Sequence, residues 1–243
     1  MRIGRVIKWS LLAIVLLLVI TAGVVYYMLS RVPEAYHPAE LTFQQRRDVA
    51  EQTFWDDVSR LNNLIHDGYR DAFRLTESRL NEYLASIDEI AVFQQGTKPG
   101  EVHEKMTSMG LAGPAVSLSE ETLTLMIRST EYNKVVSFDL RPQVENGTFS
   151  VELLDVRVGT LSLPDSMVQE QLAQLIDSLP APAEDQQQKP SEKLAVLLRT
   201  ILWSASRSAG VPANFKWDRR EVHLRRVDIK DGALILWLEP TAS

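Results

Sequence analysis

The sequence has 243 residues, of which 26 are basic and 32 acidic, with 45% hydrophobic residues and no cysteine. The hydrophobic share is typical of globular proteins and argues against a disordered chain. The lack of cysteine excludes disulfides, thiolate metal sites and a cysteine nucleophile, and the net charge of −6 argues against nucleic acid as a partner, because phosphate binding needs a basic surface.

A hydrophobic segment stands near the start of the chain. Residues 9–28 carry no charge, and a helix of that length spans about 30 Å, the thickness of a bilayer core. Residues 1–8 are basic, which by the positive-inside rule predicts a cytoplasmic tip and an extracytoplasmic chain beyond the helix. Trp9 at one end and Tyr26 and Tyr27 at the other fit interfacial aromatic belts. We therefore expect a single-pass transmembrane anchor in the cell membrane, with the lipid bilayer as its partner.

Two other interpretations of this segment are weaker. A cleaved signal peptide has an apolar region of only about 7–15 residues and a small-residue cleavage site, whereas residues 29–40 contain no A-x-A. A buried core helix fits poorly, because this segment is apolar on every face. Residues 29–40, which include Pro33 and Pro38, are then expected to form a juxtamembrane spacer.

The extracytoplasmic domain is expected to span residues 41–243 and to begin with helices. Apolar residues recur at three-to-four spacing from 41 to 66, which predicts an amphipathic helix. A short strand is expected at residues 72–75, and Thr76 is suited to cap the N-terminus of a second helix. The four glycines and one proline in residues 94–113 predict a loop.

From residue 114 the apolar period changes to two, which predicts antiparallel strands. Asn146-Gly147 marks a tight hairpin turn. The phase of the apolar residues slips at Leu153 and Leu154, which indicates a β-bulge that helps the sheet to curl. A second set of strands is expected near the end of the chain, with another phase slip at Arg225-Arg226 and a hairpin turn at Asp231-Gly232.

Two amphipathic helices are expected between these sets of strands, at residues 165–179 and 191–207. An exposed loop rich in proline and glutamine joins them at residues 180–191. The predicted fold is therefore α+β, with a single N-terminal transmembrane helix followed by a curved antiparallel sheet packed with amphipathic helices.

No motif with an established chemistry is found. The four histidines lack metal-binding spacing, and the sequence contains neither a nucleophile elbow nor a phosphate-binding glycine loop. We therefore expect no metal, no cofactor and no enzymatic activity. A hydrolase whose Ser, His and Asp come together only on folding is the weakest of three functional hypotheses.

Three phrases of the sequence carry a resemblance. Residues 73–84 (FRLTESRLNEYL), 156–164 (VRVGTLSLP) and 227–232 (VDIKDG) are similar to phrases of the YpmS-like family of small bacterial membrane-anchored proteins. The likeness covers most of residues 40–240 in order. Because these phrases describe strands, caps and turns, the resemblance implies a topology rather than an activity. The combination of helices with a curled sheet also resembles tubular lipid-binding modules of the cell envelope.

The strongest functional hypothesis is binding of an apolar ligand, such as a lipid or an acyl chain. A sheet with one apolar face that curls over helices can leave an apolar groove between them. The residues expected to line this groove are Leu123, Leu125, Ile127, Val136, Phe138, Leu198, Leu202 and Trp203. The alternative for these residues is a plain core. The second hypothesis is a scaffold or accessory subunit that holds a partner protein of the envelope at the outer face of the membrane.

Overall fold

The structure of the chain is a computed structural model. It describes residues 3–67, 72–95, 98–164, 166–168, 210–217 and 220–240, with the side chains of the first helix described from Leu16 onward. The loop expected at 180–191 and the helix expected at 191–207 lie outside the described residues, as does most of the helix expected at 165–179. Leu198, Leu202 and Trp203 belong to that part of the chain.

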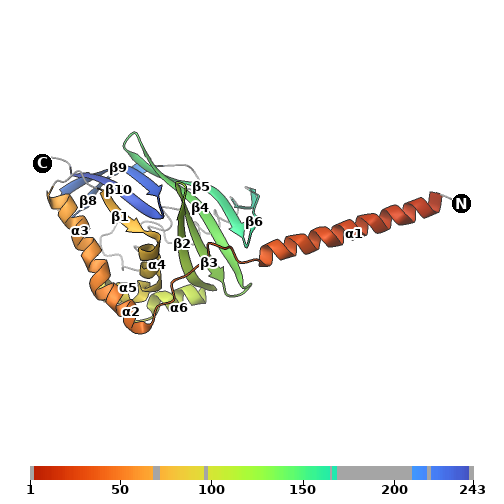
Figure 1. The fold of residues 1–243 in the computed structure, drawn as a ribbon, viewed down its shortest axis with the longest axis horizontal. Helices are drawn as coiled ribbons and strands as arrows, with labels where there is room; N and C mark the ends of the chain where they lie inside the picture. The colour runs from red at the N-terminus through yellow and green to blue at the C-terminus, as the bar shows by residue number, and fades with distance from the viewer. Residues whose placement is uncertain are drawn as a thin grey trace.

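Helices form the N-terminal part of the chain. α1 (Ile3–Ser30) extends away from the rest of the molecule (Figure 1). α2 (Phe43–Asp48), the π-helical turn η1 (Val49–Thr53) and α3 (Phe54–Asp67) follow one another without a break and confirm the helix expected from residue 41. Thr42 begins α2 as its N-cap. Across the side chains that the structure describes, no helix is both long enough and apolar enough to cross a bilayer.

The next elements confirm one prediction and correct another. β1 (Ala72–Thr76) and α4 (Glu77–Ala85) are the strand and the capped helix expected there. The prediction of a loop at residues 94–113 is wrong. α5 (Ile87–Gln95) reaches into this stretch and α6 (Glu101–Ser108) fills its middle.

The physical reason for this difference is a helix cap supplied from another helix. Asp88 Oδ1 in α5 accepts hydrogen bonds from the backbone N–H groups of Val102 at 2.9 Å and His103 at 3.1 Å, in the first turn of α6. Gly100, with a φ of +83°, takes the left-handed conformation directly before α6. Of the glycines that suggested a loop, Gly100 and Gly110 therefore lie just outside the two ends of α6.

Within the described residues all strand pairs are antiparallel, and the strands form two sheets rather than the single sheet predicted from the sequence. The small sheet has the order β1-β10-β9-β8, and the large sheet has the order β2-β3-β4-β5-β6, with β7 paired to β5. Their bounds are β2 Leu111–Ser119, β3 Thr122–Ser129, β4 Lys134–Glu145, β5 Thr148–Val158, β6 Leu161–Ser162, β7 Val211–Pro212, β8 Asn214–Trp217, β9 Arg220–Lys230 and β10 Ala233–Pro240. The α+β class of the prediction is confirmed.

Both β-bulges predicted from the apolar phase are confirmed. The register of β5 against β4 skips Leu154, and the register of β9 against β10 skips Arg225. The hairpin turns at Asn146-Gly147 and Asp231-Gly232 are also confirmed, because all four residues have positive φ, as a type I′ turn requires. These local features of the strands were therefore readable from the sequence.

Hydrophobic contacts join the two sheets and attach the helices. Val116 of the large sheet and Ile229 of the small sheet belong to one buried cluster, which also includes side chains of α4. On the small sheet, Ile65 of α3 packs against Val222 and is fully buried. The core therefore lies partly between the sheets and partly under α3.

The segment between α1 and α2, which covers most of the juxtamembrane spacer predicted for residues 29–40, packs on the large sheet and is called here the strap (residues 31–41). Tyr36 is 6% exposed and packs with Met126 on the face of the large sheet that is turned away from the small sheet. Its hydroxyl donates a hydrogen bond to the carbonyl oxygen of Gly113 at 2.7 Å. Burial raises the pKa of the Tyr36 hydroxyl. The strap thus connects α1 to α2 along the surface of the sheet.

Two side chains of α4 complete the edge strand β2. Asn81 Nδ2 donates to the carbonyl oxygen of Val116 at 2.8 Å, and Asn81 Oδ1 accepts from the N–H of Val116 at 2.7 Å. One helical turn earlier, Glu77 Oε2 accepts from the N–H of Leu118 at 2.7 Å. Backbone groups that would otherwise need a neighbouring strand are therefore satisfied by α4. Residues 73–84, which carry part of the resemblance, thus have a structural role in the edge of the large sheet.

Candidate functional site

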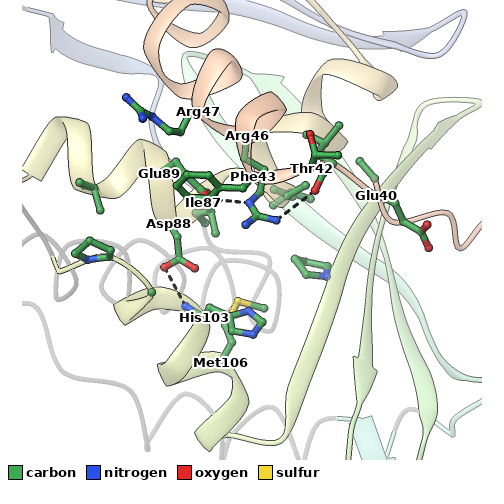
Figure 2. A pocket seen from close by; sticks show the side chains of 18 of the residues that line it. Glu40, Thr42, Phe43, Arg46, Arg47, Ile87, Asp88, Glu89, His103 and Met106 are labelled. Carbon is green, nitrogen blue, oxygen red and sulfur yellow. Dashed lines mark hydrogen bonds and ion pairs between the residues drawn. The ribbon is translucent and has the colours of Figure 1, made fainter.

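An open groove of about 1190 Å³, called here the helical groove, lies between the strap, α2, α5, α6 and the start of β2. Its walls are mainly apolar. The apolar side chains that line it include Leu41, Leu84, Ile87, Val92, Phe93 and Met106. Figure 2 shows Arg46, Asp88, His103 and Met106 facing the same space from three helices.

Polar contacts between the helices fix the walls of the groove. Arg46 of α2 pairs with Glu89 of α5, with 2.7 Å between Nε and Oε1, and Arg46 Nη1 donates to the carbonyl oxygen of Leu41 in the strap at 3.2 Å. α5 is joined to α6 through the cap that Asp88 provides. The positions of α2, α5 and α6 around the groove are therefore fixed by hydrogen bonds and an ion pair within the fold.

The charges along the groove are largely compensated within the protein. Arg47 pairs with Glu51 at 2.6 Å, as Arg46 does with Glu89. The side chain of Glu89 is only 13% exposed, and within the described part of the chain its Oε2 is buried without a hydrogen-bond partner. The polar group that this ion pair presents to the groove is therefore the guanidinium of Arg46, whose side chain is 34% exposed.

Two aromatic side chains stand exposed beside the groove. Phe43 is 62% exposed and Phe93 is 48% exposed, and both belong to the lining. The guanidinium carbon of Arg46 lies 5.9 Å from the centroid of the Phe43 ring. Large apolar side chains at the edge of an apolar groove are typical of a surface that takes up another molecule.

Five of the residues predicted to line a ligand site lie elsewhere in the structure. Leu123 and Leu125 are half-buried and pack in the cluster between the sheets. Val136 and Phe138 are half-buried and pack in a second cluster on β4 and β5, and Ile127 is half-buried in β3. None of these five residues lines the helical groove. Their role in ligand binding stays a prediction.

The aromatic residues predicted at the ends of the anchor are placed only in part. Tyr26 and Tyr27 are strongly exposed near the C-terminal end of α1. The side chain of Trp9 lies outside the described residues. The interfacial role of all three stays a prediction.

The residues of the helical groove were missed because the groove lies where a loop was expected. A signal for its helices was nevertheless present. Ile87, Ile90 and Phe93 recur at three-residue spacing in α5, and Val102 and Met106 recur at four-residue spacing in α6. Both segments are short, so that their periodicity covers little more than two turns and is easily outweighed by neighbouring glycines.

Comparison with known proteins gives no further guide to the site. No protein-family model, no curated protein and no solved structure matches the chain. The resemblance to the YpmS-like family therefore stays a prediction from three phrases of the sequence.

Proposed function

We propose that the protein is a membrane-anchored extracytoplasmic module that binds an apolar ligand, such as a lipid or an acyl chain, in the helical groove. The observation that supports this most is the size and lining of the groove. Its walls are mainly apolar, and its volume of about 1190 Å³ exceeds the range of about 300–1,000 Å³ for ordinary small-molecule pockets. A long chain suits such a groove, because each buried methylene contributes about 0.8 kcal/mol.

The ligand site in this proposal differs from the site predicted on the sheet. Four of the described residues of that sheet face, Leu123, Leu125, Val136 and Phe138, pack in hydrophobic clusters, whereas the helical groove has open volume beside apolar side chains. The partly exposed guanidinium group of Arg46 suits the head of an amphiphilic ligand. The ligand's chain then lies along the apolar residues of α5 and α6.

The membrane anchor belongs to the same proposal. Residues 9–28 carry no charge, and most of the apolar side chains described in this part of α1 are more than half exposed to solvent. They include Leu16, Leu17, Leu18, Val19, Ile20 and Val24. Such a row is unfavourable in water and favourable in a bilayer core. The basic residues 1–8 then place the N-terminus in the cytoplasm and the domain outside.

The alternative is a scaffold that holds a partner protein at the outer face of the membrane. The exposed rings of Phe43 and Phe93 favour it, because aromatic residues are enriched in protein interfaces. In this alternative an apolar segment of the partner occupies the helical groove in place of a lipid. The two functions therefore compete for one site and can be separated by identifying what occupies it.

Native mass spectrometry of the full chain, purified in detergent from cells, tests the proposal. We expect a lipid mass to stay bound to the wild type and to be lost from Ala85→Trp, because Ala85 lines the groove and a tryptophan side chain there obstructs it. Asn63→Trp is the matched control, since Asn63 is exposed on α3 and outside the groove lining.

Two results of this experiment would contradict lipid binding in the groove. One is a wild type without bound lipid, and the other is equal lipid retention by the wild type and Ala85→Trp. A bound protein mass that disappears in Ala85→Trp and persists in Asn63→Trp would favour the scaffold instead.

A further inference from the structure

The C-terminal end of α1 is fixed to the large sheet by direct contacts. The carbonyl oxygen of Met28 accepts hydrogen bonds from the N–H of Thr160 at 3.0 Å and from its hydroxyl at 3.2 Å. Gly159 lets the two backbones meet, because a Cβ at this position would lie 2.5 Å from the carbonyl oxygen of Met28 and 2.7 Å from that of Leu29. The helix therefore meets the domain backbone to backbone at its last turn.

A lysine at the start of β4 adds a second contact. Lys134 Nζ lies 2.6 Å from Ser30 Oγ and 5.2 Å from the centroid of the Tyr26 ring. Lys134 directly follows the turn at residues 130–133, so that this β3–β4 turn lies beside the end of α1. Tyr132 in the turn is 67% exposed.

The junction between α6 and β2 lies at the same end of the domain. The N–H of Thr130 donates to the carbonyl oxygen of Gly110 at 2.8 Å, which joins this junction to the β3–β4 turn. Met109, which precedes Gly110, is 56% exposed. Tyr132, Lys134 and Met109 are called here the anchor-proximal end; Figure 1 shows α1 leaving the domain from its β6 side.

We infer that the anchor-proximal end lies against the lipid headgroups of the outer leaflet and is a membrane-contact surface of the domain. This inference rests on the anchor of the proposed function. The segment expected to span the bilayer ends at Met28, and its last residues Tyr26 and Met28 already contact the domain. No length of chain is left to hold the domain away from the bilayer.

The chemistry of this end fits a headgroup layer. Tyr26 belongs to the expected interfacial belt, and Lys134 touches its ring, so that the β3–β4 turn lies at the depth of the headgroups. A tyrosine places its ring among the lipid headgroups, and a lysine ammonium binds phosphate while its stem stays in apolar surroundings. The chain as a whole is acidic, so that attraction by net charge does not explain this orientation. The contacts of α1 with the sheet impose it.

Site-specific labelling tests this contact in the full chain. The chain has no cysteine, so that a single introduced cysteine carries a unique fluorophore. Tyr132→Cys and, as control, Glu145→Cys are labelled and reconstituted in vesicles of phosphatidylethanolamine and phosphatidylglycerol that contain lipid with a nitroxide on its headgroup. Glu145 is exposed at the opposite end of β4, roughly 35 Å of strand away.

We expect the label at position 132 to be quenched several-fold more strongly than the label at position 145. Equal quenching at both positions, in a chain that floats with the vesicles, overturns the inference and leaves the anchor intact. A chain that does not float with the vesicles overturns the anchor, and the inference falls with it.

Discussion

The clamp of α4 on β2 predicts a large loss of stability from one small substitution. Asn81 is 8% exposed and makes hydrogen bonds of 2.8 and 2.7 Å to the carbonyl oxygen and the N–H of Val116. Asn81→Ala removes both bonds. The N–H and the carbonyl oxygen of Val116 are then left without partners, although Val116 is itself buried. The groove depends on the same contact, because α4 provides Leu84 and Ala85 to its lining.

The expected magnitude follows from the two bonds and the groups they satisfy. Each hydrogen bond contributes about 1 kcal/mol net, and a buried backbone group left unsatisfied costs about 1–3 kcal/mol. We therefore expect Asn81→Ala to lower the free energy of unfolding by about 2–4 kcal/mol. Asn81→Asp keeps an acceptor for the Val116 N–H but places a carboxylate oxygen against the Val116 carbonyl. Its loss is expected to shrink as the pH falls and the carboxyl group becomes a donor.

Urea unfolding of the full chain in detergent micelles, followed by tryptophan fluorescence, measures this loss. Asn63→Ala is the matched control, because Asn63 is exposed on α3, and its effect is expected to stay within about 0.5 kcal/mol. If Asn81→Ala lost no more than Asn63→Ala, the reasoning that α4 completes the edge of β2 would be refuted.

Three further substitutions test other contacts. Gly159→Ala places a Cβ at a residue with a φ of +61°, 2.5 Å from the carbonyl oxygen of Met28. We expect the free energy of unfolding to fall by at least about 1–2 kcal/mol and hydrogen exchange at the Thr160 amide to become faster. Unchanged exchange would contradict the contact between α1 and the large sheet. Glu89→Leu removes the ion-pair partner of Arg46 and is expected to lower the free energy of unfolding by about 1–2 kcal/mol. This is less than for a fully buried pair, because the arginine side chain is 34% exposed. Urea unfolding measures this loss, and a neutral result would show that the pair does not hold α2 on α5. Burial, and then the hydrogen bond to a neighbouring carboxylate, raise the pKa of Tyr83. Above about pH 10 the unfolded state therefore loses this proton first, and the free energy of unfolding falls as the pH rises. Tyr83→Phe is expected to flatten that fall above about pH 10, and an unchanged slope would count against it.

The bulges and turns of the strands could be predicted because they depend on residues that are close together in the sequence. At Leu154 and Arg225 the apolar residues change phase, and a strand with one buried face has to place an extra residue there. The turn at Asn146-Gly147 needs positive φ, which asparagine and glycine tolerate. Likewise, the side chain of Thr76 accepts a hydrogen bond from the N–H of Arg79, as expected of an N-cap.

The features that were missed depend on residues far apart in the chain. The division into two sheets arises because β8, β9 and β10 pair with one another and with β1 rather than with the strands of the large sheet, and no neighbouring residue signals that choice. The strap is packed because Tyr36 reaches the carbonyl of Gly113. The start of α6 depends on Asp88 of another helix. The sequence therefore indicated a glycine-rich loop in place of α6, and the groove between these helices was not predicted.

Photo-crosslinking with a phospholipid that carries a diazirine on its acyl chain locates the ligand on the full chain in vesicles. Binding in the helical groove predicts crosslinks in residues 84–106, in addition to those of α1 with the bilayer. These crosslinks are expected to fall sharply in Ala85→Trp and to persist in Asn63→Trp. Crosslinks confined to α1 and the anchor-proximal end, with none in α5 or α6, would contradict the proposed function.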